Sequence, residues 1–185
     1  MATRIHIPIL LLGVALILPL DPAAALRLDE ARLPPLPEPL ANTAAGMLDG
    51  RIAVAGGMNA AWREGRESGL SRAIYVFDGD TDEWRLAAEL PQGRQQAAPV
   101  PIEDTLWLIG GLLLSGSTDT ILVLRSTDGV LRVDPDYVPP LPAPCETLAA
   151  ATLAGTVYVS GIRAGQPHFW TLDATAPADG WRELR

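Results

Sequence analysis

The hydrophobic residues of this 185-residue chain gather in short runs, and two of these runs end in a pair of glycines. The clearest runs are residues 51–57 (RIAVAGG) and 105–111 (TLWLIGG), with a looser copy at 156–161 (TVYVSG). Several β-prone residues followed by glycine indicate a buried strand and then a turn that side chains would obstruct. The copies recur about every 50 residues, each about 20 residues after a Leu-Pro turn, which predicts a repeated β unit.

Each repeat is predicted to contain four strands. Asp49-Gly50 and Ala154-Gly155 have the residue types of tight hairpin turns, Trp181 falls where Trp84 does, and helical periodicity is absent. The predicted strands cover residues 42–47, 51–55, 72–77 and a fourth from Trp84; then 96–101, 105–109, 120–125 and 130–133; then 147–153, 156–159, 167–173 and 181–184. The fold class expected is all-β, with three four-stranded propeller blades at about 33–89, 90–137 and 138–185. Propellers have about four to eight blades, so three correspond to half of a six-bladed ring.

The N-terminal 25 residues have the pattern of a secretory signal peptide. Arg4 precedes an apolar run from Ile7 to Leu20, and Ala23 and Ala25 satisfy the small-residue rule for cleavage. We therefore expect cleavage near Ala25, a polar lead-in over residues 26–32, and a periplasmic or secreted protein without a membrane segment after cleavage. A retained membrane anchor is the alternative.

Composition excludes several classes of function. The net charge of −8 argues against a nucleic-acid partner held by a basic surface. All 14 basic residues are arginine, which excludes a Schiff-base lysine mechanism, and Cys145 has no second cysteine for an intrachain disulfide. With one cysteine, and His168 as the one histidine after the signal, the usual zinc and copper sites cannot be built, so no metal or other cofactor is predicted.

One acidic segment has the spacing of a calcium-binding loop. Asp78, Asp80 and Asp82 alternate as calcium ligands do, with Glu89 further along. Glu83, however, occupies the sixth position, where the calcium loop requires glycine. An acidic hairpin turn is the better interpretation.

The repeats resemble the kelch repeat. The features that carry the resemblance are the strand ending in Gly-Gly, the long loop, residues 74–78 (IYVFD) and Trp84. More narrowly, residues 55–59 (AGGMN) and 90–94 (LPQGR) resemble the cyclically permuted mutarotases, relatives of N-acetylneuraminate epimerases. Two departures are Ala60-Ala61, where that branch has Phe-Pro, and the apolar residues 112–114. The resemblance implies an exported sialic-acid mutarotase or epimerase whose catalytic glutamate would belong to a blade after Arg185.

Four residues are candidates for binding a sugar acid. Arg94 is predicted to hold the sugar carboxylate, because a planar guanidinium matches a carboxylate in bidentate fashion. An arginine that braces neighbouring blades is an equally good interpretation of Arg94. Asn59, Glu64 and Arg66 lie in the long loop after the first Gly-Gly, where sites often occur, although a solvated loop of mixed charge is the alternative.

Two functions follow from these observations. The first is a carbohydrate epimerase or mutarotase, an isomerase that takes a sugar acid, truncated here and inactive alone. The second is a non-catalytic kelch module that binds a protein or a glycan. Three blades would leave a blade face and edges uncovered, so we expect a second propeller half or a homo-oligomer as partner.

Overall fold

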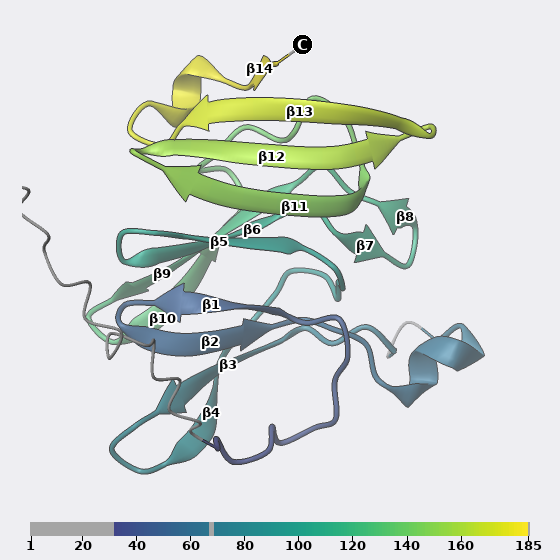
Figure 1. The fold of residues 1–185 in the computed structure, drawn as a ribbon. Coiled ribbons are helices and arrows are strands. Elements are labelled where there is room, and N and C mark those ends of the chain that lie inside the picture. The colour runs from purple at the N-terminus through teal and green to yellow at the C-terminus, as the bar shows by residue number, and fades with distance from the viewer. Residues whose placement is uncertain (1–31, 67–68, 185) are drawn as a thin grey trace, which may run out of the picture. The chain divides into compact units, whose positions relative to one another are not determined.

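The computed structural model describes residues 32–66 and 69–184. This part of the chain is all-β and contains three four-stranded antiparallel sheets (Figure 1). We call these sheets blades 1, 2 and 3 in chain order. The predicted signal peptide at 1–25 and all of the predicted lead-in except Arg32 lie outside the described residues, so cleavage and export remain predictions.

In each blade the strands follow one another in space as they do in sequence. Blade 1 consists of β1 (Ala44–Leu48), β2 (Arg51–Ala55), β3 (Ala73–Asp78) and β4 (Glu83–Glu89). Blade 2 consists of β5 (Ala98–Ile102), β6 (Thr105–Ile109), β9 (Ile121–Thr127) and β10 (Val130–Asp134). Blade 3 consists of β11 (Glu146–Leu153), β12 (Thr156–Arg163), β13 (Gln166–Asp173) and β14 (Arg182–Glu183). Outside the blades lie a short hairpin, β7 (Leu112–Leu113) and β8 (Gly116–Ser117), and two 3₁₀ helices, η1 (Ala60–Glu64) and η3 (Pro177–Asp179).

The second strand of blade 3 is longer than predicted, and one side chain explains the difference. In blades 1 and 2 the strand ends at Gly56-Gly57 and Gly110-Gly111, whose second glycines have φ angles of 106° and 107°. Side chains rarely adopt such angles. Blade 3 has Ile162 at the second position, so β12 continues to Arg163 and pairs with β13 along its whole length. A long loop therefore follows the second strand in blades 1 and 2, whereas a tight turn follows it in blade 3.

Two hydrophobic cores hold the blades together, and blade 2 contributes to both. The first core joins blades 1 and 2, and the second joins blades 2 and 3. In blade 2 the side chains alternate between them: Leu106 and Leu108 lie in the first core, and Trp107 and Ile109 lie in the second. This is the period-two alternation of a strand that is buried on both faces.

Two tryptophans at equivalent positions fasten a proline-rich segment to the outer strand of the same blade. We call residues 33–37 and 138–142 the proline straps of blades 1 and 3. The indole N–H of Trp84 donates to the Pro34 carbonyl at 2.8 Å, and that of Trp181 donates to the Pro139 carbonyl at 3.0 Å. The equivalence predicted from sequence is thus confirmed, and the two rings perform the same structural task. In blade 2 the strand registers place Val133, the partner of Leu124, at this position.

We expect Trp84→Phe and Trp181→Phe each to lower the free energy of unfolding by about 1 kcal/mol, the net contribution of one hydrogen bond. A phenyl ring replaces the larger indole, so some packing is lost together with the N–H donor. Urea denaturation followed by circular dichroism measures the effect. Tyr158→Phe is the control, because the Tyr158 hydroxyl makes no hydrogen bond within the described part of the chain. A loss in the control equal to that in the tryptophan variants would contradict this account.

Candidate functional site

Arg94 is a buried residue that connects the glycine turns of two blades. Its side chain is 4% exposed, and its guanidinium donates to the Gly110 carbonyl at 3.0 Å and to the Thr120 hydroxyl at 3.1 Å. The carbonyl of Arg94 in turn accepts from the Gly57 N–H at 2.8 Å. Burial lowers the pKa of the guanidinium to about 10, so the group is still charged at neutral pH. These contacts favour the blade-bracing interpretation of Arg94 over sugar binding.

Cys145 occupies in blade 3 the place that Arg94 has in blade 2. Each follows a Leu-Pro pair at the same spacing, and each side chain lies beside the glycine that follows the apolar run of the second strand, Gly110 for Arg94 and Gly161 for Cys145. The thiol is buried, and burial raises its pKa, although Arg163 acts in the opposite direction. A buried thiol with a raised pKa is a poor nucleophile, so Cys145 acts as a packing residue.

The loop after the first Gly-Gly folds largely on itself. Asn59 caps η1, because its side-chain oxygen accepts from the Ala61 N–H at 2.9 Å. Glu64 and Arg66 form an ion pair at 2.7 Å, but both side chains are more than half exposed, so the pair adds little stability. Gly69 packs so tightly against Trp62 that an added Cβ would lie 2.2 Å from the Trp62 nitrogen.

The structure divides the four predicted site residues between two places. Glu64 and Arg66 are brought together, and Asn59 starts the 3₁₀ helix that leads to them. The hydrogen bonds of the Arg94 side chain go to blade 2. Among the described residues, no hydrogen bond or ion pair joins the Arg94 side chain to Asn59, Glu64 or Arg66.

The acidic segment between β3 and β4 makes the hairpin turn predicted from the sequence. The carboxylate of Asp78 accepts from the Asp80 N–H at 3.0 Å and pairs with Arg85 at 2.8 Å. Its oxygens thus bond to the turn backbone and the neighbouring strand. Within residues 32–66 and 69–184, no group of three or more acidic, histidine or cysteine side chains is placed to hold a metal ion.

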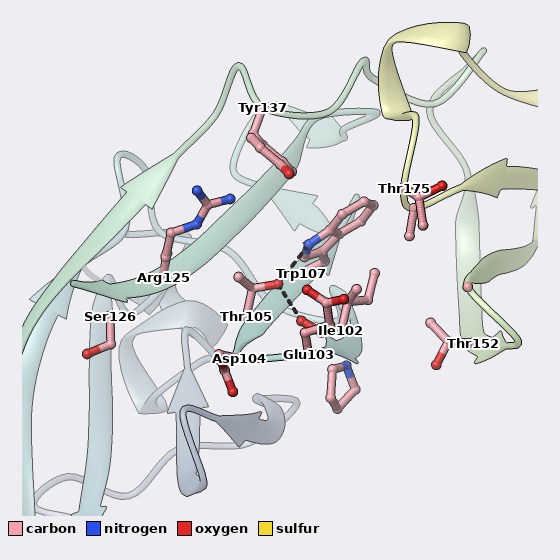
Figure 2. A pocket seen from close by; sticks show the side chains of 13 residues that line it. Ile102, Glu103, Asp104, Thr105, Trp107, Arg125, Ser126, Tyr137, Thr152 and Thr175 are labelled. Carbon is pink, nitrogen blue, oxygen red and sulfur yellow. Dashed lines mark hydrogen bonds between the residues drawn. The ribbon is translucent and has the colours of Figure 1, made fainter.

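A pocket of about 740 Å³ lies between blades 2 and 3, beside the turn that joins β5 to β6 (Figure 2). Thr105, at the start of β6, lines it, whereas Arg94 bonds to Gly110 just beyond the end of the same strand. The pocket is therefore at the opposite end of the blades from Arg94. Its lining residues are Pro101, Ile102, Glu103, Asp104, Thr105, Trp107, Arg125, Ser126, Tyr137, Thr152, Gly155, Ala174 and Thr175.

A fixed aromatic pair forms one wall of this pocket. Trp107 is 1% exposed, and its ring meets that of Tyr137 edge to face, with centroids 6.2 Å apart. The Trp107 indole N–H donates to the Thr105 hydroxyl at 3.1 Å, and this hydroxyl donates to the Ile102 carbonyl at 2.8 Å (Figure 2). Packing and hydrogen bonds thus hold Trp107, while Tyr137 stays partly exposed.

Charged groups of both signs surround the aromatic pair. The Arg125 guanidinium lies 4.6 Å from the centre of the Tyr137 ring, a cation–π distance, and Glu103 and Asp104 form the turn beside it. On the blade 3 side, Thr175 donates to Asp173 through its hydroxyl at 2.6 Å and through its N–H at 2.9 Å. These bonds lower the pKa of the Asp173 carboxyl and fix the Thr175 wall.

Sequence reasoning did not identify this pocket. The sequence patterns singled out none of Arg125, Tyr137, Glu103 and Asp104. One signal was present: the turn between the first and second strands contains glycine in blades 1 and 3, at Gly50 and Gly155, but is Glu103-Asp104 in blade 2. The turn of blade 2 thus carries two carboxylates, where that of blade 1 carries one and that of blade 3 none.

No helix in the part of the chain that the structure describes is long and apolar enough to cross a membrane.

Comparison with known proteins finds kelch proteins. The chain is 29% identical over 138 residues to Kelch-like protein terF of Aspergillus terreus, across 70% of this chain and 29% of that protein. It is 27% identical over 133 residues to Kelch-like protein 35 of Mus musculus, across 72% and 21% respectively. It is 35% identical over 101 residues to Beta-scruin of Limulus polyphemus, across 54% and 10%.

The chain spans less than a third of the length of these relatives. No model of a known protein family matches it. The comparisons do not support the narrower resemblance to the permuted mutarotases. Together with the three four-stranded blades, the similarities support a kelch-repeat family for this chain.

Proposed function

We propose that this chain is a non-catalytic kelch module that binds a peptide segment of a protein partner. The observation that carries the proposal is the pocket between blades 2 and 3, with the exposed ring of Tyr137 held between Trp107 and Arg125. Rigid aromatic rings supply contact area at a low cost in conformational entropy, and tyrosine, tryptophan and arginine are enriched where proteins bind one another. The kelch similarities agree with this role.

The charges around the pocket favour a particular peptide. The carboxylates of Glu103 and Asp104 favour a basic side chain, while the Tyr137 ring offers an apolar surface to the stem of that side chain. The Arg125 guanidinium can donate to a backbone carbonyl of the peptide. We therefore expect a segment in which arginine or lysine stands next to an apolar or aromatic residue.

Selection of a random peptide library on the purified full chain tests this function. We expect enrichment of peptides with a basic residue beside an apolar one, and loss of binding of at least about tenfold, or 1.4 kcal/mol, in Tyr137→Ala. The double variant Glu103→Gln, Asp104→Asn should weaken binding and also reduce its dependence on salt concentration. Calorimetry with one selected peptide gives both values.

Glu64→Gln is the matched control, because Glu64 is an exposed carboxylate in the loop after β2 and does not line the pocket. The peptide should bind this variant as it binds the unmodified chain. Failure to enrich any peptide would overturn the proposal, as would selected peptides that bind Tyr137→Ala with unchanged affinity.

The alternative function is sialic-acid mutarotase activity, and it rests on the sequence resemblance alone. Its predicted carboxylate-binding residue, Arg94, is buried and bonded to Gly110 and Thr120, which counts against a sugar site there. The measurement that would favour this alternative is faster exchange between sialic acid anomers, observed by NMR, in the presence of the purified chain.

A further inference from the structure

One face of blade 3 presents exposed apolar side chains over several strands. Leu153 on β11 is 70% exposed, and Ile162 on β12 and Phe169 on β13 are 41% and 40% exposed. The Phe169 ring also contacts that of Tyr158, with centroids 6.3 Å apart. Exposed apolar side chains that share one face of a sheet indicate an interaction site.

The same face of blade 2 shows what such a partner is. In blade 2 this face is buried against blade 3, and we call it the leading face. The strand registers place the leading-face residues of the two blades in correspondence. The equivalent positions, blade 2 first, are Trp107 and Tyr158, Ile109 and Ser160, Ile121 and Phe169, Val123 and Thr171, and Ile102 and Leu153. The exposed face of blade 3 is therefore equivalent to the face of blade 2 that is buried against blade 3.

The opposite half of this interface is present on blade 1. In blade 3 the side chains that pack on blade 2 form what we call the trailing face, and the strand registers identify its equivalent in blade 1. The equivalent positions, blade 3 first, are Val157 and Ile52, Val159 and Val54, Trp170 and Tyr75, and Leu172 and Phe77.

The proline straps show that, among the described residues, blade 1 is covered less completely than blade 3, although Val54 and Tyr75 of its trailing face are buried. Val138 in the blade 3 strap is 2% exposed, because blade 2 packs over it, whereas the equivalent Leu33 in the blade 1 strap is 42% exposed. The strap itself is held in the same way in both blades, since Trp84 and Trp181 bond to equivalent prolines. A leading face packed on blade 1 would bury Leu33 as blade 2 buries Val138.

We propose that the leading face of blade 3 packs on the trailing face and proline strap of blade 1 in a second copy of this chain. One chain carries both halves of an interface that it already makes once, between blades 2 and 3. Such a head-to-tail contact is heterologous, and two copies form a closed ring when the second contact repeats the first. The inference does not depend on the peptide pocket, whose residues lie between blades 2 and 3 of the same copy.

Light scattering on the size-separated full chain tests the proposal. We expect twice the mass of one copy for the unmodified chain. Phe169→Arg and Leu33→Arg should each weaken association by at least about tenfold, because an arginine buried in an apolar contact lacks a partner. Leu153→Arg provides a second variant of the leading face. Val130→Arg is the control, because Val130 is 55% exposed on β10 of blade 2 and belongs to neither open face.

A mixture of two defective copies gives the sharpest result. When Phe169→Arg and Leu33→Arg copies pair, both arginines lie in one contact and the other contact is unaltered. We therefore expect the mixture to recover dimers that neither variant forms alone. A face-to-face dimer through blade 3 would instead tolerate Leu33→Arg and would not be rescued by mixing. Three outcomes would overturn the proposal: a face-to-face dimer of this kind, a monomeric unmodified chain, and association that neither variant weakens.

Discussion

Replacing Trp107 with alanine should lower the free energy of unfolding by about 3–5 kcal/mol, the cost of removing a large aromatic ring from a core. Trp107 is 1% exposed and packs in the core that joins blades 2 and 3. Its loss would leave a cavity between two sheets and would also remove the N–H donor to Thr105. Urea denaturation at a fixed protein concentration, followed by circular dichroism, measures the change.

Tyr137→Ala is the matched control for this prediction. Tyr137 contacts the same tryptophan ring but is 41% exposed, so its removal should cost about 1 kcal/mol or less. The two variants therefore separate stability from binding: Trp107→Ala should lose both, and Tyr137→Ala should lose peptide binding alone. Equal destabilisation by the two changes would show that Trp107 is not the anchor of this core.

Replacing Arg94 with alanine should lower the free energy of unfolding by about 2–4 kcal/mol, because a cavity forms and buried hydrogen-bonding partners are left unsatisfied. The partners are the Gly110 carbonyl and the Thr120 hydroxyl, which fix the turn after β6. Arg94→Lys should recover only part of the loss, since a single ammonium group does not reach two partners with the geometry of a planar guanidinium. The loss should be the same with or without a sugar acid in the buffer.

Arg66→Ala is the control, because Arg66 is an exposed arginine paired only at the surface, and its removal should change stability by less than about 0.5 kcal/mol. If Arg94→Ala unfolds at the same urea concentration as the unmodified chain, the bracing role is wrong. A sugar acid that stabilised the unmodified chain but not Arg94→Ala would support the carboxylate-binding interpretation instead.

The blades were predictable because the signals that specify them are local. β2 and β6 begin and end where the sequence indicated, since an apolar run followed by Gly-Gly determines both the buried strand and the backbone angles that end it. The shared task of Trp84 and Trp181 followed from their equivalent places in the repeats. The extension of β12 was also encoded locally, by Ile162 in place of the second glycine, although the prediction stopped the strand earlier.

The surroundings of each side chain were decided only by the tertiary structure. Arg94 precedes a strand, as many loop arginines do. It is buried because Gly110 and Thr120, which are distant from it in sequence, lie beside its side chain in the folded blade. The pocket likewise brings together Glu103, Tyr137 and Thr175, which come from three separate parts of the chain and from two blades. The sequence by itself indicated the three blades of the described residues and most of their strands and turns, because these depend on neighbours along the chain. The binding surface depends on how the faces of successive blades meet, which no single repeat contains.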